Sequence, residues 1–116
     1  MARTPSTMLP LGTPAPDFAL PDCDGRGHAL AEFNAAPALL VVFICGHCPF
    51  VRHLRAGFAA LAREYQPRGL AVVAINSNDV AAYPQDGPDG MRTEAAELGY
   101  VFPYLLDATQ SVAKAY

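Results

Sequence analysis

The stretch ALLVVFICGHCPFVRH, residues 38–53, decides the fold, because two secondary-structure patterns meet in it at a pair of cysteines. Residues 38–44 form an unbroken apolar run rich in β-branched side chains, which predicts a strand buried on both faces, as in a parallel sheet. From Pro49 onward the apolar residues recur with helical spacing, and proline suits the first turn of a helix. Residues 45–48 therefore lie at a strand–helix junction.

The segments around this stretch extend the pattern into an α/β domain. The run at 70–76 repeats the buried-strand pattern, so residues 38–44, 49–66 and 70–76 predict a strand–helix–strand crossover. One stripe of the helix is expected to face the core: Phe50, Leu54, Phe58, Leu61 and Tyr65. Gly57 inside this helix suggests close packing.

Shorter elements are expected before and after the crossover. Two short strands, 18–20 and 28–30, flank a turn at Asp24-Gly25. A second helix should end at Gly99, followed by a brief strand and a last helix capped by Asp107 or Thr109.

Composition limits the class of protein. With 116 residues, 52% of them hydrophobic and 16% charged, the chain fits one folded domain, 1–116, in which proline-rich residues 1–16 form an irregular arm. A net charge of -3 provides no basic surface for nucleic acid. No signal peptide and no apolar run of membrane-spanning length is visible, so the sequence predicts a cytoplasmic protein without membrane association.

The cysteine pair at this junction indicates redox chemistry. Cys45 and Cys48 are separated by two residues, and the amides and dipole of a helix N-terminus favour a thiolate there. We expect Cys45 to be the exposed attacking thiol with a lowered pKa, and Cys48, shielded by Pro49 and Phe50, to be the resolving thiol. A protonated His47 between them would stabilise the thiolate. Such exchange needs no cofactor beyond an external reductant or oxidant.

Two other interpretations of the pair remain open. Both cysteines could be inert core residues. A zinc site needs about four ligands, and only Cys23, His28, His47 and His53 are available to complete one. Cys23 lies between two aspartates that should raise its pKa and make it a poor nucleophile. His28 and His53 are expected at the surface, as are Arg52 and Arg55.

Four segments together resemble the redoxin branch of the thioredoxin-like superfamily, which includes alkyl hydroperoxide reductase/thiol-specific antioxidant proteins: LGTPAPDFALPDCDG, LLVVFICGHCPFVRHLRAGFAALAREY, VVAINSND and FPYLLDATQSVAKAY. The motif CGHC is also similar to the active site of protein disulfide isomerase domains. The resemblance implies a thioredoxin-like fold, a central mixed sheet flanked by helices. It further implies Cys45 as nucleophile and Cys48 as resolving cysteine, and it places Asn76 to Asn78 at the same sheet edge, where these residues and Asp79 are expected to form turns and a cap.

The chain also departs from the family pattern. No acidic residue interrupts the strand at 38–44, so the buried proton acceptor of thioredoxins is not expected. Val42 stands where peroxiredoxins place Thr or Ser before the attacking cysteine, which disfavours peroxide reduction. The cis-proline loop, hairpin and final helix of family members would follow Tyr116. Without them the strand at 38–44 has an open edge, which motivates the hypothesis of a homodimer through that edge.

The sequence thus predicts a thiol–disulfide oxidoreductase that uses Cys45 and Cys48, with His47 at the site, and acts on protein or small-molecule disulfides or thiols. Two alternatives come from other classes of protein. One is a metal-binding, copper-delivery-like module that uses both cysteines and a histidine. The other is a non-catalytic redoxin-fold interaction protein.

Overall fold

The computed structural model describes residue 5 and residues 7–116. Of the predicted arm at 1–16, residues 1–4 and 6 lie outside the described residues, and the rest contains neither helix nor strand. The first regular elements are the antiparallel strands β1 (Ala19–Pro21) and β2 (Gly27–Ala29). Gly25 adopts a positive φ of 84° in the turn between them, and the Asp22 carboxylate accepts two backbone N–H groups there. The expected hairpin is therefore present, and each strand lies one residue closer to the turn than predicted.

The central sheet contains β3 (Ala38–Phe43), β4 (Leu70–Asn76) and β5 (Tyr104–Leu106), in the order β3-β4-β5 with both pairs parallel. One antiparallel bridge between Asp22 and Leu105 joins the hairpin to β5. The predicted crossover from β3 through a helix to β4 is confirmed.

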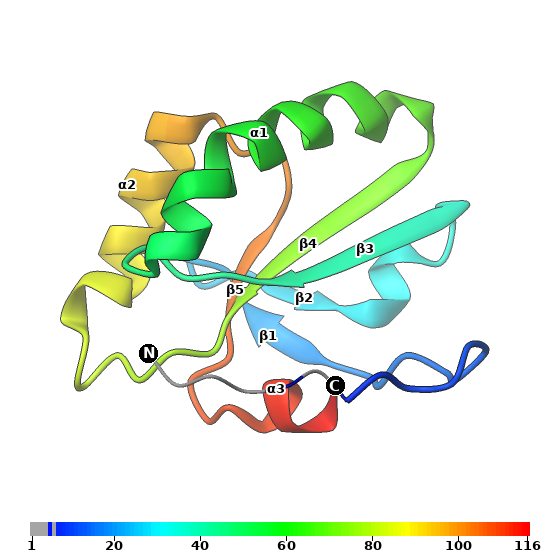
Figure 1. Cartoon of the computed structure of the whole chain (residues 1–116), viewed down its shortest axis with the longest axis horizontal. Coiled ribbons are helices and arrows are strands. Elements are labelled where there is room, and N and C mark those ends of the chain that lie inside the picture. Colours follow the sequence, from blue (N-terminus) through cyan, green and yellow to red (C-terminus); the bar gives the residue numbers. More distant parts are fainter. Residues whose placement is uncertain (1–4, 6) are drawn as a thin grey trace.

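Helices cover both faces of this sheet (Figure 1). The long helix α1 (Pro49–Tyr65) and α2 (Pro88–Leu98) lie over one face. The hairpin, the 3-10 turn η1 (Leu30–Phe33) and α3 (Ser111–Ala115) lie over the other. Two further 3-10 turns are η2 (Gln66–Arg68) and η3 (Pro84–Asp86). As predicted, α2 ends at a left-handed Gly99. The Asp107 carboxylate accepts the N–H groups of Val112 and Ala113 at the start of α3.

None of the described helices combines the length and the apolar content needed to cross a bilayer.

The strand β4 forms the centre of the core. Its side chains alternate, so that Val72 and Ala74 pack under α1 and α2, whereas Val73 and Ile75 pack against the hairpin side. All four are buried, as the sequence predicted. The same prediction is wrong for β3, none of whose residues is fully buried. Strand β3 is at the edge of the sheet, so its outer side has no neighbouring strand among the described residues.

The predicted buried stripe of α1 is wrong except at Phe58, which packs against the core. Phe50 is 69% exposed and Leu54 is 64% exposed, whereas the buried residues of the helix are Ala59 and Ala62. Two small side chains allow α1 to approach β4 closely, and this contact leaves Phe50 and Leu54 outside the core. Gly57 has no atom within 4 Å of the position of an added Cβ, so it does not serve close packing.

Candidate functional site

The two cysteines flank the loop that connects β3 to α1. The N–H of Ile44 donates to the Ile75 carbonyl at 3.0 Å, which continues the sheet pairing up to Cys45. Cys48 is the N-cap residue of α1 in an extended conformation, and Pro49 occupies the first helical turn. The structure thus confirms that Cys45 and Cys48 lie at the junction between strand and helix.

The environment of Cys45 differs from the expected one. Cys45 is buried, with 8% of its surface exposed, rather than exposed. Burial raises the pKa of its thiol, and the nearby Asp86 charge raises it further. The backbone N–H groups of Cys48 and His47 lower this pKa but offset only part of the rise. The predicted lowered pKa of Cys45 is therefore wrong for this conformation, because loss of hydration outweighs the backbone N–H groups at the helix start.

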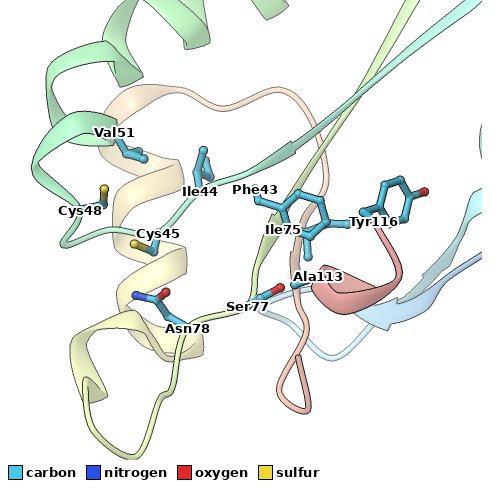
Figure 2. Close-up of a pocket in the computed structure, with 10 residues that line it drawn as sticks. All are labelled: Phe43, Ile44, Cys45, Cys48, Val51, Ile75, Ser77, Asn78, Ala113 and Tyr116. Atoms are coloured by element: carbon cyan, nitrogen blue, oxygen red, sulfur yellow. The ribbon is translucent and has the colours of Figure 1, made fainter. Parts of the chain in front are cut away.

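The order of exposure within the pair is also reversed. Cys48 is half-buried, and its predicted shield is incomplete because Pro49 and Phe50 are both exposed. Both thiols are free, and both line the same open hollow of about 450 Å³ beside the edge strand (Figure 2). A second hollow of about 530 Å³ has Cys45, His47, Cys48 and Asn78 in its wall. The pair therefore borders open space on two sides.

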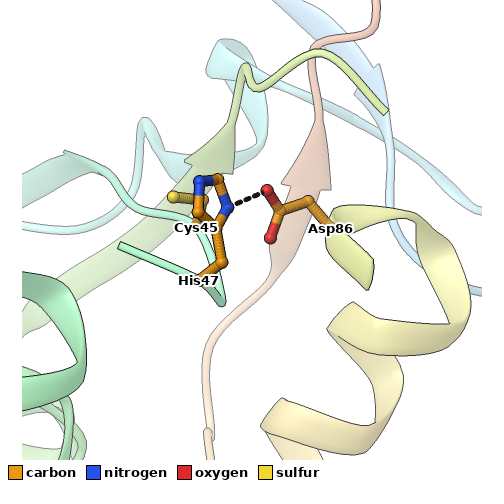
Figure 3. Close-up of side chains that lie close together, drawn as sticks. All are labelled: Cys45, His47 and Asp86. Carbon is orange, nitrogen blue, oxygen red and sulfur yellow. Dashed lines mark hydrogen bonds and ion pairs between the residues drawn. The ribbon is translucent and has the colours of Figure 1, made fainter. Parts of the chain in front are cut away.

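His47 is held by residues from a distant loop. Its Nδ1 is hydrogen-bonded to the carboxylate of Asp86, 39 residues further along the chain (Figure 3). The ring of Tyr83 stacks on the imidazole, with 4.3 Å between ring centroids and an interplanar angle of 14°. The His47 side chain is 30% exposed, whereas that of Asp86 is 0% exposed. Sequence reasoning missed Asp86 and Tyr83.

The loop after β4 brings Asp86 to the site. The side-chain amide of Asn76 donates to the Asp86 carbonyl at 2.6 Å, and that of Asn78 donates to the Asp86 carboxylate at 2.9 Å. The expected sheet-edge position of Asn76 to Asn78 is thus confirmed, with a role beyond turn formation. Asp79 is a cap as expected, because its carboxylate accepts the N–H groups of Ala81 and Ala82.

A second buried carboxylate, Glu94 of α2, lies behind the cysteine loop. A Cβ added to Gly46 would lie 3.0 Å from one Glu94 oxygen and 3.6 Å from Asp86 Oδ1. Tyr100 and Tyr104 donate their hydroxyl protons to Glu94, and the pKa of both phenols is raised, by burial first and then by this carboxylate. Strand β3 has no acidic residue, as the sequence showed. The buried acids nearest the cysteine loop come instead from η3 and α2.

Within the described residues, one set of three metal-type donors comes together: Cys45, His47 and Asp86, whose ligand atoms lie within 4.8 Å of one another. This set differs from the predicted one, which used both cysteines and a histidine. It has fewer than the four ligands of a structural zinc site, and two of its members already bond to each other. We interpret it as a hydrogen-bonded pair, His47 and Asp86, beside the Cys45 sulfur.

The other candidate residues lie away from the pair. Cys23 is half-buried at the hairpin, and its pKa is raised, by burial first and then by Asp24, while Arg92 opposes the rise. This agrees with the predicted poor nucleophile. His53 and Arg52 are exposed as expected, whereas Arg55 is half-buried and lines a hollow with His47.

His28 is a structural residue, half-buried between two carboxylates. Its ring nitrogens contact Glu32 and Asp22, each at 2.9 Å. Burial alone would lower the pKa of His28, but the bonds to Glu32 and Asp22 outweigh burial and raise it.

The raised pKa of His28 predicts a pH-dependent stability. A histidine with a raised pKa in the folded state stabilises the fold below its unfolded pKa, and this contribution is lost as the pH rises through the folded pKa. His28→Gln should therefore lower the free energy of unfolding by about 0.5–1 kcal/mol at about pH 5.5 and by less at about pH 8.5. Urea unfolding at both pH values measures this, with His53→Gln as the control. Equal losses at the two pH values would contradict the prediction.

Comparison with known proteins agrees with this geometry: the fold and the cysteine junction define a thioredoxin-like protein. Residues 11–116 match the AhpC/TSA family, and the chain belongs to this family. It is similar to a hypothetical protein of Sinorhizobium meliloti, with 53% identity and a TM-score of 0.94 over 98% of this chain and 62% of that chain. An uncharacterized conserved protein of Geobacillus kaustophilus shows 49% identity and a TM-score of 0.91 over 99% of this chain and 63% of that one.

A relative with a named activity is the thiol-disulfide oxidoreductase ResA of Geobacillus thermodenitrificans. It is 26% identical over 113 residues, which are 97% of this chain and 60% of ResA. The chain thus spans about three fifths of the length of these three relatives.

Proposed function

We propose that the chain is a thiol–disulfide oxidoreductase with Cys45 and Cys48 as its redox pair. One observation carries the proposal. Cys45 lies at the carboxyl end of an edge strand, beside the start of α1, and borders two hollows that Cys48 also lines. Family membership supports thiol-based redox chemistry, and the oxidoreductase relative supports disulfide exchange as its form.

The reaction proceeds in two exchanges. The Cys45 thiolate attacks one sulfur of a substrate disulfide; a new S–S bond forms between them, the substrate S–S bond breaks, and the released thiolate takes a proton. The Cys48 thiolate then attacks the Cys45 sulfur of this mixed disulfide. The products are a Cys45–Cys48 disulfide and a reduced substrate, so two electrons pass to the substrate. An external dithiol restores the reduced pair.

Catalysed reduction of insulin by dithiothreitol tests the proposal. The wild-type chain should accelerate insulin precipitation above the dithiothreitol background, whereas Cys45→Ser/Cys48→Ser should not. Cys23→Ser is the matched control and should retain the wild-type rate, because Cys23 lies at the hairpin away from the pair. Equal rates for the wild type and the double variant would contradict the proposal.

The same purified proteins distinguish the peroxidase and metal-binding alternatives from the proposed function. Peroxide consumption by Cys48→Ser would indicate a peroxidase. Stoichiometric zinc or copper in the purified chain would indicate the metal-binding alternative. We retain a disulfide or thiol substrate, a homodimer through the outer edge of β3 and a cytoplasmic location as proposals. Size-exclusion chromatography over a dilution series tests the dimer.

A further inference from the structure

The site contains a buried charge that the two exchange steps do not use. The Asp86 side chain is fully buried, and its carboxylate contacts His47 and Asn78 while Oδ1 has no hydrogen-bond partner within the described chain. Taking a carboxylate out of water costs free energy unless it is paired. Its pairing with the histidine of the CGHC motif therefore calls for an explanation.

Anchoring of the loop does not provide that explanation. The Asp86 backbone is held separately, because its carbonyl accepts the Asn76 amide at 2.6 Å and its N–H donates to the Tyr83 carbonyl at 2.9 Å. The carboxylate is thus left to the contacts with His47 and Asn78.

These contacts determine the orientation of the His47 imidazole relative to Cys45. Nδ1 is bonded to the Asp86 carboxylate and lies 3.3 Å from the Asn78 side-chain nitrogen. The stacked Tyr83 ring restricts rotation, so Nε2 is the nitrogen left to exchange a proton. In Figure 3 the Cys45 sulfur lies on the side of the ring away from Asp86. The sulfur, a ring nitrogen and a carboxylate oxygen lie within 4.8 Å of one another. The sulfur is therefore a neighbour of the His47–Asp86 pair, close enough for a proton to pass after a small movement of the side chains.

We propose that Asp86 is a positioning residue whose carboxylate holds His47 in the orientation in which the imidazole accepts the thiol proton of Cys45. The S–H bond of Cys45 breaks and an N–H bond forms on His47, which leaves a thiolate beside an imidazolium, with no change in oxidation state. Asp86 then faces the imidazolium and stabilises it. This assignment rests on the proposed exchange function, for which it supplies the attacking thiolate.

Other charged groups surround His47 in balanced numbers. Arg52 and Arg55 of α1, with Glu94 and Glu97 of α2, line the hollow that His47 also lines. On the sulfur side lie Cys45 and Cys48, and Tyr83 covers the ring. Asp86 is the charged group in direct contact with the imidazole.

A role of Asp86 through its charge alone and a positioning role through His47 predict opposite effects of Asp86→Asn on the alkylation rate of Cys45. If Asp86 acted only by its charge, Asp86→Asn would remove a negative charge near the Cys45 sulfur and make its alkylation faster. If Asp86 acts through His47, the same change disturbs the imidazole and makes alkylation slower. We expect about tenfold slower alkylation near neutral pH, equivalent to a rise of about one unit in the pH midpoint.

The experiment measures iodoacetamide alkylation of Cys45 against pH in a Cys23→Ser/Cys48→Ser background, where it is the only thiol. Asp86→Asn and His47→Gln should slow the reaction to the same extent, and the double variant no further. Glu94→Gln is the matched control, because Glu94 is a buried carboxylate behind the same loop but is bonded to tyrosines instead of His47. In this variant, His47→Gln should still slow the alkylation of Cys45.

Each outcome decides the assignment. Faster or unchanged alkylation in Asp86→Asn overturns it, as does equal slowing in Glu94→Gln. If Asp86→Asn does not fold, His47→Gln replaces it, and an unchanged pH profile in that variant overturns the assignment. Alkylation needs no disulfide substrate, so it measures the proton transfer from Cys45 to His47 whether or not the chain reduces insulin. An inactive wild type in the insulin assay would therefore reject the proposed function without deciding this assignment.

Discussion

Cys48→Ser should accumulate a mixed disulfide between Cys45 and its substrate, whereas Cys45→Ser should form none and should lose exchange activity by about a thousandfold or more. The difference follows from the order of the two exchanges. Without Cys48 the first S–S bond forms on Cys45, and no neighbouring thiol is left to break it. Without Cys45 the first bond does not form. Mass spectrometry of the reduced single variants, freed of reductant and then incubated with a disulfide peptide, measures both species.

This experiment also tests the assignment of roles, because the structure leaves Cys48 more accessible than Cys45. A mixed disulfide on Cys48 in Cys45→Ser, with no mixed disulfide in Cys48→Ser, would make Cys48 the attacking thiol and Cys45 the resolving thiol. The exchange chemistry itself would be unchanged. Cys23→Ser should behave as the wild type. Equal trapping in both single variants would show that neither thiol has a defined role.

The sequence predicted the order of elements because local patterns determine it. The apolar runs at 38–44 and 70–76, Pro49 at the helix start and Gly99 at a helix end are all signals within a few residues of the structures they specify. The burial of α1 was not predictable in the same way. Both the large apolar residues and the alanines of that helix have helical spacing, and only the approach of α1 to β4 selects Ala59 and Ala62.

In the candidate site, too, the sequence predicted what local patterns determine and missed what tertiary contacts determine. Cys45, His47 and Cys48 are adjacent in the sequence, so their meeting at the junction could be predicted. Asp86 reaches His47 across 39 residues, and no local pattern connects the two. A partial signal was present, since Asn76 to Asn78 were expected at the same sheet edge and Asp86 belongs to the loop that follows. What the sequence did not indicate is that the Asn76 side chain turns this loop back toward the cysteines.

Gly90→Ala should lower the free energy of unfolding by about 2 kcal/mol or more, a larger loss than most single substitutions produce. A Cβ on Gly90 would overlap the Gln85 carbonyl oxygen and lie 2.9 Å from its carbonyl carbon. Because the obstacle is backbone, no change of rotamer relieves it, and η3 and α2 have to move apart. Gly57→Ala is the matched control, since its Cβ meets nothing within 4 Å, and it should raise stability by about 0.5–1 kcal/mol.

The same substitution connects the fold to the chemistry of the site. Gln85 precedes Asp86, so a displaced η3 carries the carboxylate away from His47 and slows Cys45 alkylation as Asp86→Asn does. Urea unfolding of the Gly90→Ala and Gly57→Ala variants measures the stability, and alkylation of Cys45 in folded Gly90→Ala measures the displacement. Wild-type stability in Gly90→Ala would contradict the close packing of η3 on α2. A destabilised variant with wild-type alkylation would show that the contact between His47 and Asp86 does not depend on that packing.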